Sequence, residues 1–162
     1  MTFDPNLRMS LWDDPEEAKT QMLWGLRQAD IVKISDEEVR FLWGCSAREG
    51  AQRLLDEYGV KLAMVTMGAN GALLVNRRAS VTSECPPVHP VDTTGAGDIF
   101  GGSAVSRIIK LGKKPEDLDE EELNGIAAFA TIAASLSTQK PGGIPSVPDE
   151  DDVFRMITEV PR

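Results

Sequence analysis

The residues of this sequence best suited to chemistry lie together in the stretch Asp-Thr-Thr-Gly-Ala-Gly-Asp-Ile-Phe, residues 92–100. A long helical pattern begins within this stretch, so the first-turn N–H groups of that helix lack backbone partners and carry a partial positive charge. Gly95 and Gly97 leave the backbone without side chains, which allows an anion to approach closely. The stretch therefore predicts an anion-binding turn, although it matches neither the Walker loop nor the full dinucleotide fingerprint.

Asp98 suggests that this turn does more than bind an anion. A carboxylate in the first turn of an anion-binding helix would repel a phosphate unless it faced a second reactant, from which it could take a proton. Phosphoryl transfer requires positioning, charge neutralisation and one group that orients the nucleophile. The alternative is that Asp98 is only a favourable acid at a helix N-terminus, and the residues alone leave both interpretations open.

Length and composition set limits on the class of protein. A chain of 162 residues with 41% hydrophobic and 27% charged residues is typical of one globular domain. The formal net charge of -9 requires phosphates to be bound at a local site and argues against a nucleic-acid partner. Cys45 and Cys85 lie far apart without metal-ligand spacing, so we expect reduced thiols rather than a disulfide or a thiolate metal site. The longest nearly apolar run, Gly125–Leu136, is shorter than the roughly 20 residues of a membrane span. We therefore expect a cytoplasmic protein without a membrane partner.

The apolar patterns predict alternating helices and strands in the first half of the chain and mainly helices in the second half. Two helices are expected to begin with a Ser-x-x-Glu capping box, formed by Ser35 with Glu38 and by Ser46 with Glu49. Such an alternation is typical of a layered α/β domain. The expected helices are residues 15–29, 35–44, 46–59, 95–111, 120–137 and 149–159, and the expected strands are 31–34, 61–66, 72–75 and 79–83, with a strand end within residues 1–6.

Two glycine-containing pairs call for an explanation. Gly68-Ala69-Asn70-Gly71 joins two expected strands in a hairpin-like corner, and we expect Asn70-Gly71 to supply the positive φ angles of a tight turn. Gly101 and Gly102 lie inside an expected helix, where each costs roughly 1 kcal/mol relative to alanine. Close packing against the bare backbone is the expected compensation for these two glycines.

The stretch at residues 92–100 resembles the signature D-T-x-G-A-G-D-x-F of the PfkB family of sugar kinases and matches it at every fixed position. This resemblance implies a three-layer, Rossmann-like α/β core of the ribokinase type. It also implies ATP-dependent phosphorylation of a sugar hydroxyl. In the family, the residue that corresponds to Asp98 is the catalytic base, and the backbone amides at Gly95, Ala96 and Gly97 form the anion hole.

Other segments resemble family motifs in the expected order along the chain. Residues 66–71 are similar to T-x-G-x-x-G, which implies that Thr66, Gly68 and Gly71 lie beside the ATP phosphates; a plain hairpin is the alternative. Residues 35–38 are similar to N-x-x-E with serine in place of asparagine. Glu38 is therefore expected either to hold magnesium through water or only to cap its helix.

A fructokinase-like segment lies at residues 4–12, which resemble D-P-N-x-R followed by L-W. It implies that Arg8 contacts a phosphate or the sugar, and an ordinary surface arginine is the alternative.

Residues 129–148 resemble the family segment that lines the adenine and a monovalent-cation site. The resemblance places Thr131, where asparagine or histidine is usual in the family, and Gly142 beside the nucleotide. A potassium ion would be held by the side chains of Asp92 and Ser146 and by the carbonyl groups of Thr94, Ser137, Lys140 and Gly142.

The resemblance covers residues 1–162 and begins where the second half of a complete family member begins. In the family, the first half carries sugar-binding residues and a β lid, through which copies of the protein could also associate. We therefore expect the C-terminal ATP-binding and catalytic part of a PfkB carbohydrate kinase domain, acting with ATP, magnesium and potassium on a small sugar. Residues 4–12 favour fructose, converted to fructose 6-phosphate. The alternatives are 2-keto-3-deoxygluconate, ribose or a nucleoside as acceptor, and a non-catalytic nucleotide-binding fragment.

Overall fold

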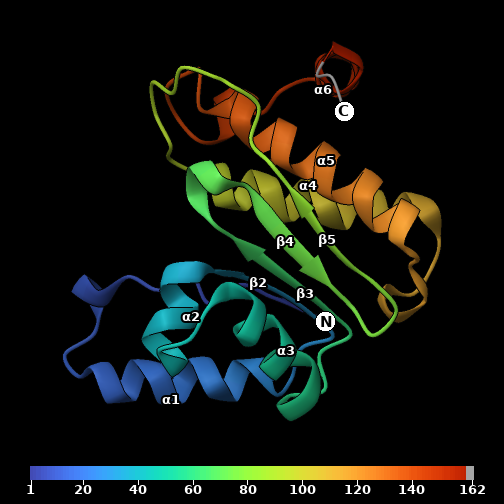
Figure 1. Ribbon diagram of the computed structural model, residues 1–162. Helices are drawn as coiled ribbons and strands as arrows, with labels where there is room; N and C mark the ends of the chain where they lie inside the picture. The colour runs from blue at the N-terminus through green and yellow to red at the C-terminus, as the bar shows by residue number, and fades with distance from the viewer. Residues whose placement is uncertain (160–162) are drawn as a thin grey trace.

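The computed structural model describes residues 1–159 and has a central sheet with helices on both faces (Figure 1). Residues 160–162, the end of the expected domain, lie outside the described residues. The elements are β1 (Thr2–Phe3), η1 (Met9–Leu11), α1 (Pro15–Leu26), β2 (Ile31–Ser35), α2 (Asp36–Trp43), α3 (Ala47–Glu57), β3 (Leu62–Thr66), η2 (Gly68–Asn70), β4 (Ala72–Val75), β5 (Ser80–Ser83), α4 (Ala96–Leu111), η3 (Pro115–Asp117), α5 (Glu120–Ser137), η4 (Ile144–Ser146) and α6 (Glu150–Glu159). The sequence-based prediction placed the α-helices and β-strands correctly, with boundaries that differ by at most a few residues, and did not include the short 3-10 helices η1 to η4.

The sheet has five strands in the order β1-β2-β3-β4-β5. β1, β2 and β3 are parallel, so their carboxyl ends meet at one edge of the sheet. β4 runs antiparallel to β3 and β5 runs antiparallel to β4. Ser35, the last residue of β2, is in register with Thr66, the last residue of β3. The loops that follow these two strands therefore start side by side.

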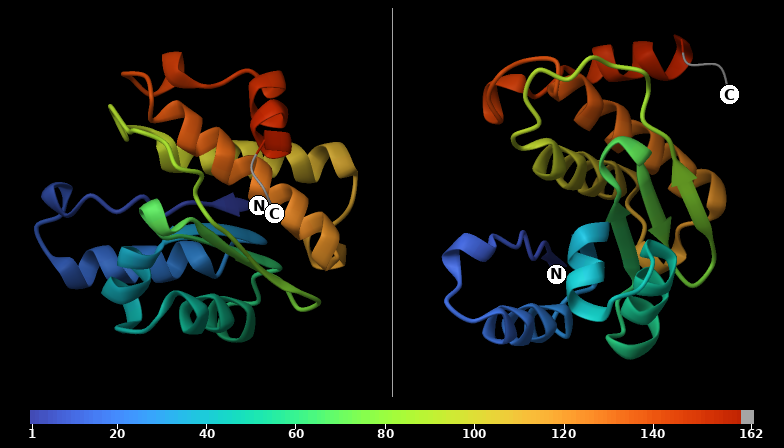
Figure 2. Two further views of the ribbon diagram at one scale, coloured as in Figure 1. Left: turned by 45° about the horizontal axis from the view of Figure 1, so that its top comes forward. Right: turned by 60° about the vertical axis from the view of Figure 1, so that its left-hand side comes forward.

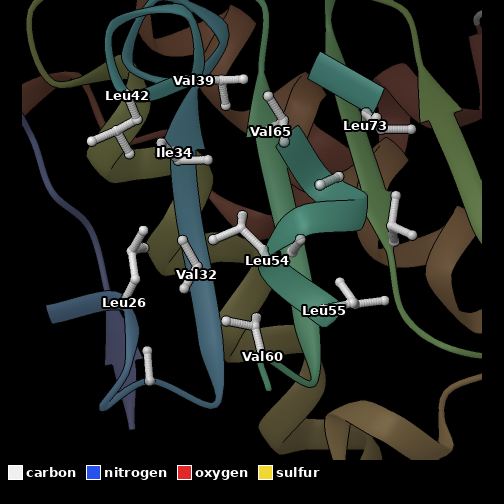
Figure 3. Packing of buried hydrophobic residues seen from close by; sticks show 14 of the residues in the cluster. Leu26, Val32, Ile34, Val39, Leu42, Leu54, Leu55, Val60, Val65 and Leu73 are labelled. Carbon is white, nitrogen blue, oxygen red and sulfur yellow. The ribbon is translucent and has the colours of Figure 1, made fainter. Parts of the chain in front are cut away.

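Each face of the sheet is covered by its own helical layer, which confirms the predicted three-layer α/β core. α1, α2 and α3 cover one face, where Val32 and Ile34 of β2 pack against Leu26 and Leu54 (Figure 3). α4 and α5 cover the opposite face, where Ile31 of β2 packs. Figure 2 shows the two layers from further directions, with α6 beyond α5. Because side chains alternate along a strand, β2 is buried on both faces, which explains its nearly continuous apolar sequence.

Local caps set the helix boundaries as the sequence predicts. Both capping boxes are present, and the Glu38 and Glu49 backbone N–H groups donate to the Ser35 and Ser46 side chains. Gly44 ends α2 in the left-handed region at φ 66°, which glycine adopts without a Cβ penalty. Among residues 1–159, no helix is both long enough and apolar enough to cross a membrane.

The turn between β3 and β4 differs from the prediction. The positive φ angles are at Gly68 (55°) and Gly71 (86°), whereas Asn70 is not among the residues with positive φ. The chain makes one turn of 3-10 helix at Gly68–Asn70, and the Met67 N–H donates to the Gly71 carbonyl over 2.8 Å. The predicted connection between the two strands, residues 67–71, is therefore confirmed, but Asn70-Gly71 supplies a positive φ angle only at Gly71, and Gly68 supplies the other.

The predicted close packing at Gly101 and Gly102 is also wrong. A Cβ at Gly101 would meet the nearest atom, Cγ of Lys33, at an ordinary contact distance of 3.8 Å. A Cβ at Gly102 would have no heavy atom within 4 Å among the described residues. Steric crowding within residues 1–159 therefore does not require either glycine.

Two glycine substitutions should affect stability in opposite directions. A Cβ at Gly25 of α1 would overlap the Phe3 ring, so we expect Gly25→Ala to lower the free energy of unfolding by about 1–3 kcal/mol. Gly125 lies in α5 with open space where a Cβ would be, so Gly125→Ala should raise the same quantity by about 0.5–1 kcal/mol. Urea denaturation followed by circular dichroism measures both changes. Equal effects of the two substitutions would contradict the packing of Phe3 on α1.

Candidate active site

The candidate site lies at the edge of the sheet where the parallel strands end. Asp4 follows β1, Ser35 ends β2 and Thr66 ends β3. Ligands of open α/β sheets bind outside the carboxyl ends of such strands, because the loops and helix N-termini converge there. The N-terminus of α4 contributes the Gly-rich turn to this region.

Gly95 starts the turn and adopts the left-handed conformation with φ 79° as the N-cap of α4. A Cβ on Gly95 would lie 3.1 Å from the Gly143 Cα, so both the backbone angle and this close approach favour glycine. The Ala96 N–H donates to the Thr93 carbonyl over 3.2 Å, and the Ile99 N–H donates to the Gly95 carbonyl over 2.9 Å. Within residues 1–159, the N–H groups at 95, 97 and 98 make no backbone hydrogen bond. The turn therefore presents unpaired donors, as an anion site requires.

A cavity of about 620 Å³ opens beside this turn. Asp98 is exposed and lines the cavity together with Arg8, Thr94 and Gly95. These four residues come from two segments more than 80 positions apart in the sequence, and the fold brings them together. The carboxylate, the guanidinium and the start of the turn can therefore act on one bound molecule.

The far wall of the cavity is mainly apolar and is formed by α5, the loop after it and α6. Phe129, Val147 and Val153 contribute to this wall. Arg107 of α4 lies over the rings of Phe129 and Phe154, 5.1 and 5.3 Å from their centroids, and pairs with Glu150 of α6. These contacts attach α6 to the α4–α5 layer and complete a wall that suits a flat apolar group.

Glu38 fixes the loop that carries Arg8. Its carboxylate accepts a hydrogen bond from the Leu7 N–H over 2.6 Å and another from the Ser35 N–H over 2.8 Å. Only 8% of Glu38 is exposed. The capping role is therefore confirmed, and the same carboxylate also anchors the residue before Arg8. The magnesium role of Glu38 stays a prediction.

Asp92 joins the segment before the turn to the loop after α5. Its carboxylate accepts hydrogen bonds from the Thr94 N–H over 2.9 Å and from the Gly142 N–H over 2.8 Å. The Gly142 bond and then the Thr94 bonds lower the pKa of Asp92 to about 2. Hydrogen bonds to the ionised form cause this shift, because they stabilise the carboxylate relative to the acid.

The predicted potassium ligands lie in the same pair of loops. Asp92 contacts the Gly142 backbone, and the buried Ser146 hydroxyl donates to the Gly143 carbonyl over 2.7 Å. The Ser137 carbonyl accepts the Lys140 N–H over 3.3 Å. Within residues 1–159 no group of three or more His, Cys, Asp or Glu side chains could hold a metal ion. A donor set of one carboxylate with hydroxyl and carbonyl oxygens fits a weakly bound monovalent cation, and the assignment stays a prediction.

All five predicted nucleotide-binding residues, Thr66, Gly68, Gly71, Thr131 and Gly142, lie outside the cavity lining. Thr66, Gly68 and Gly71 lie at the end of β3 and in the turn after it, at the same edge of the sheet. Thr131 is 2% exposed, and its hydroxyl has no hydrogen-bond partner within the described residues. The Thr131 side chain is covered by protein, so its predicted contact with adenine would require a local rearrangement.

Sequence reasoning missed Lys33, and the structure corrects the explanation of Gly97. A Cβ on Gly97 would lie 2.8 Å from the Lys33 Nζ. A side chain at this position would therefore point toward the sheet, and Gly97 does not line the cavity. Lys33 is the only charged residue in the otherwise apolar run Ile31–Ile34 of a doubly buried strand, and this pattern was the signal that could have identified it.

Comparisons with known proteins agree on one family. The sequence profile of the pfkB family carbohydrate kinases matches residues 1–150. Fructokinase-1 of Zea mays is 40% identical over 159 residues, which cover 97% of this chain and 48% of the maize protein. The chain spans about half the length of most of the curated relatives it matches.

Solved structures give the same result. A double mutant of fructokinase from Vibrio cholerae O395, bound to fructose, ADP and potassium ion, superposes with a TM-score of 0.80 at 30% identity over 95% of this chain and 49% of that one. Aminoimidazole riboside kinase from Salmonella enterica, bound to aminoimidazole riboside and an ATP analogue, superposes with a TM-score of 0.80 at 27% identity. That likeness covers 97% of this chain and 52% of the Salmonella chain.

The Asp92 bridge should be lost only in strong acid. Because the folded-state pKa of Asp92 is lowered from 3.8 to about 2, the bridge is fully present above the ordinary pKa and is lost as the pH falls through 2. We expect the Asp92 carboxyl carbon to titrate near 2 by NMR and the Gly142 amide signal to follow it. Asp92→Asn serves as the control and should remove this titration from the Gly142 amide. An unchanged Gly142 profile in that variant would contradict the bridge.

Proposed function

Because the chain belongs to the pfkB family of carbohydrate kinases, we propose that it forms the nucleotide-binding and catalytic half of an ATP-dependent sugar kinase. The observation that carries the proposal is the shared cavity of Asp98, Arg8 and the start of the α4 turn. A base, a cation and unpaired amides within one cavity match the needs of phosphoryl transfer, which depends on positioning and charge stabilisation.

In the proposed reaction, the Asp98 carboxylate accepts the proton of a sugar hydroxyl. The hydroxyl oxygen attacks the γ-phosphorus of ATP, the bond to the β-phosphate oxygen breaks, and ADP leaves. Unpaired N–H groups at the start of α4 would stabilise the charge on the transferred group, because donors fixed in a helix turn need no rearrangement as the charge develops. The amides of Gly95, Ala96 and Gly97 form the proposed anion hole, in which the Ala96 N–H would exchange its bond to the Thr93 carbonyl for the anion. Arg8 contributes a guanidinium at the edge of this hole.

Fructose is the proposed acceptor, and fructose 6-phosphate is the proposed product. The D-P-N-L-R segment with Arg8 at the cavity supports this choice, as does the likeness to a fructokinase solved with fructose. The riboside kinase with a similar fold and score supports a nucleoside as the alternative acceptor. Ribose and 2-keto-3-deoxygluconate are further alternatives within the family.

Cations are proposed at two places. Glu38 would hold magnesium through water, with Thr66, Gly68 and Gly71 beside the phosphates and Thr131 and Gly142 toward the adenine. Magnesium would neutralise charge on the β- and γ-phosphates. A potassium ion would be held by the loops of Asp92 and Ser146, together with the carbonyl groups of Thr94, Ser137, Lys140 and Gly142. The bridge between these loops through Asp92 supports the potassium proposal.

A second candidate function is nucleotide binding without catalysis. The chain spans about half the length of most matched relatives. The family resemblance implies that the sugar-binding residues lie in the other half. Without those residues the acceptor hydroxyl would not be held in line with the γ-phosphate, and loss of positioning removes several powers of ten in rate.

Replacement of the proposed base should affect turnover and leave nucleotide binding nearly intact. In an active kinase that contains this half, we expect Asp98→Asn to lower kcat by roughly 10² to 10⁴, because a positioned base contributes that much. The affinity for ATP should change by less than about fivefold, since the amide keeps the shape of the side chain. A coupled ADP-release assay and calorimetry measure the two effects. Near-normal turnover of the variant would remove Asp98 from the mechanism.

The two candidate functions make different predictions for the 162-residue chain. We expect the chain alone to bind magnesium-ATP but to release no ADP when fructose is added. Addition of the N-terminal half of the maize fructokinase relative should restore release with fructose ahead of glucose, ribose and adenosine, because that half supplies the sugar pocket. Robust activity of the chain alone would contradict the division of substrates between halves. Activity with adenosine only would contradict fructose as the acceptor.

A further inference from the structure

Lys33 is a buried cation that lies directly beneath the α4 turn. It is the middle residue of β2, on the sheet face covered by α4 and α5, and only 7% of it is exposed. Its side chain runs along α4 toward the helix N-terminus. Its Cγ lies near Gly101, and its Nζ would be 2.8 Å from a Cβ on Gly97. The ammonium group therefore lies on the opposite side of the turn from the cavity.

The partner of this ammonium group comes from the loop that carries Arg8. Asp4, four residues before Arg8, places its Oδ2 3.0 Å from the Lys33 Nζ. Burial raises the pKa of the Asp4 carboxyl, and nearby Lys33 partly opposes this rise, while Glu38 adds to it. A single, partly desolvated carboxylate is thus the only acidic partner in an ion pair with Lys33 among residues 1–159.

This position of a lysine is unfavourable in the absence of an anion. The N-terminus of α4 already carries partial positive charge, so a cation beneath it is repelled by the helix dipole. Burial removes the hydration of the ammonium group, and one carboxylate compensates only in part. An anion at the turn would reverse this balance, because the helix N-terminus and the ammonium group would then both attract the same charge. No other cation is buried beneath the turn within residues 1–159.

We propose that Lys33 is a positioning residue of the phosphate site, which adds positive charge from beneath the turn without touching the nucleotide and ties the Arg8 loop to α4. This proposal rests on the proposed function, since it requires a phosphate at the turn. Lys33 explains why position 97 is a glycine, because any side chain there would displace the ammonium group. Lys33 thus links β2, the Asp4 loop and α4 into one support for the anion.

The primary test removes the charge of Lys33 and keeps its volume. We expect Lys33→Met in the 162-residue chain to weaken magnesium-ATP binding about 10- to 100-fold, the range for a charge several ångströms away through protein. Adenosine affinity should stay unchanged, because adenosine has no phosphate. NMR titration measures both affinities. Lys61→Met is the matched control: Lys61 is exposed at the opposite end of the neighbouring strand, so ATP binding should change less than twofold.

A second set of variants separates the charge of Lys33 from a purely structural role. Asp4→Asn removes the compensating negative charge and keeps an acceptor for the Asn6 N–H, so ATP affinity should be maintained or increased. Lys33→Met/Asp4→Asn leaves no unpaired charge and should show the ATP loss of Lys33→Met in a normally folded chain. Gly97→Ala should weaken ATP binding in the wild-type background and have a smaller effect in the Lys33→Met background, where no ammonium group is displaced.

The outcomes distinguish this inference from the proposed function. Equal losses in Lys33→Met and Asp4→Asn, or equal losses of ATP and adenosine affinity, would show that the pair only supports the fold and would overturn the proposal. Normal ATP binding by a folded Lys33→Met/Asp4→Asn chain would overturn it as well, and leave the kinase assignment untouched. A wild-type chain that binds no magnesium-ATP would overturn both the kinase assignment and the role of Lys33.

Discussion

The unpaired N–H groups at the start of α4 impose the constraint on which the rest of the site depends. They can bind an anion only if no side chain covers them and if the helix N-terminus faces an open cavity. Gly95 satisfies the first condition because it has no side chain, and its φ of 79° is one that glycine adopts without strain. Asp92 holds the segment before the turn to the loop after α5. The parallel strands satisfy the second condition, because their carboxyl ends share one edge of the sheet and the loop after β1 brings Arg8 to the cavity at this helix terminus.

The positions of the acidic residues follow from the same constraint. Asp98 lies on the cavity side of the turn, whereas the Glu38 and Asp92 carboxylates are bound by backbone N–H groups. Hydrogen bonds of this kind fix a carboxylate to the backbone and reduce its freedom to contact a ligand directly. Among Asp98, Glu38 and Asp92, only Asp98 has a position that suits the proposed base, and the other two mainly hold loops in place.

The sequence predicted the layers and the caps well because each depends on local chemistry. A Ser-x-x-Glu pair and a glycine after a helix act within a few residues, so Ser35, Glu38 and Gly44 could be interpreted without a fold. The positive φ angle expected at Asn70 lies at Gly68 instead, because the 3-10 turn at Gly68–Asn70 determines which residues of the connection leave the usual backbone region. The second function of Glu38, which holds Leu7 in a distant loop, could not be predicted, because it links residues 31 positions apart.

Lys33 and Gly97 show why the chemistry of a site can be invisible to a motif. Gly97 belongs to the signature, and the sequence suggests that it leaves space for an anion. A Cβ at this position would point toward Lys33 in the sheet instead. The protein carries a net charge of -9, so its overall field repels ATP, and attraction must come from nearby groups. An exposed lysine in the cavity would be hydrated, and its charge would be screened by water and salt. A lysine beneath the turn is shielded from both, and it requires a residue without a side chain above it. A signature glycine can therefore be required by a cation that lies outside the signature.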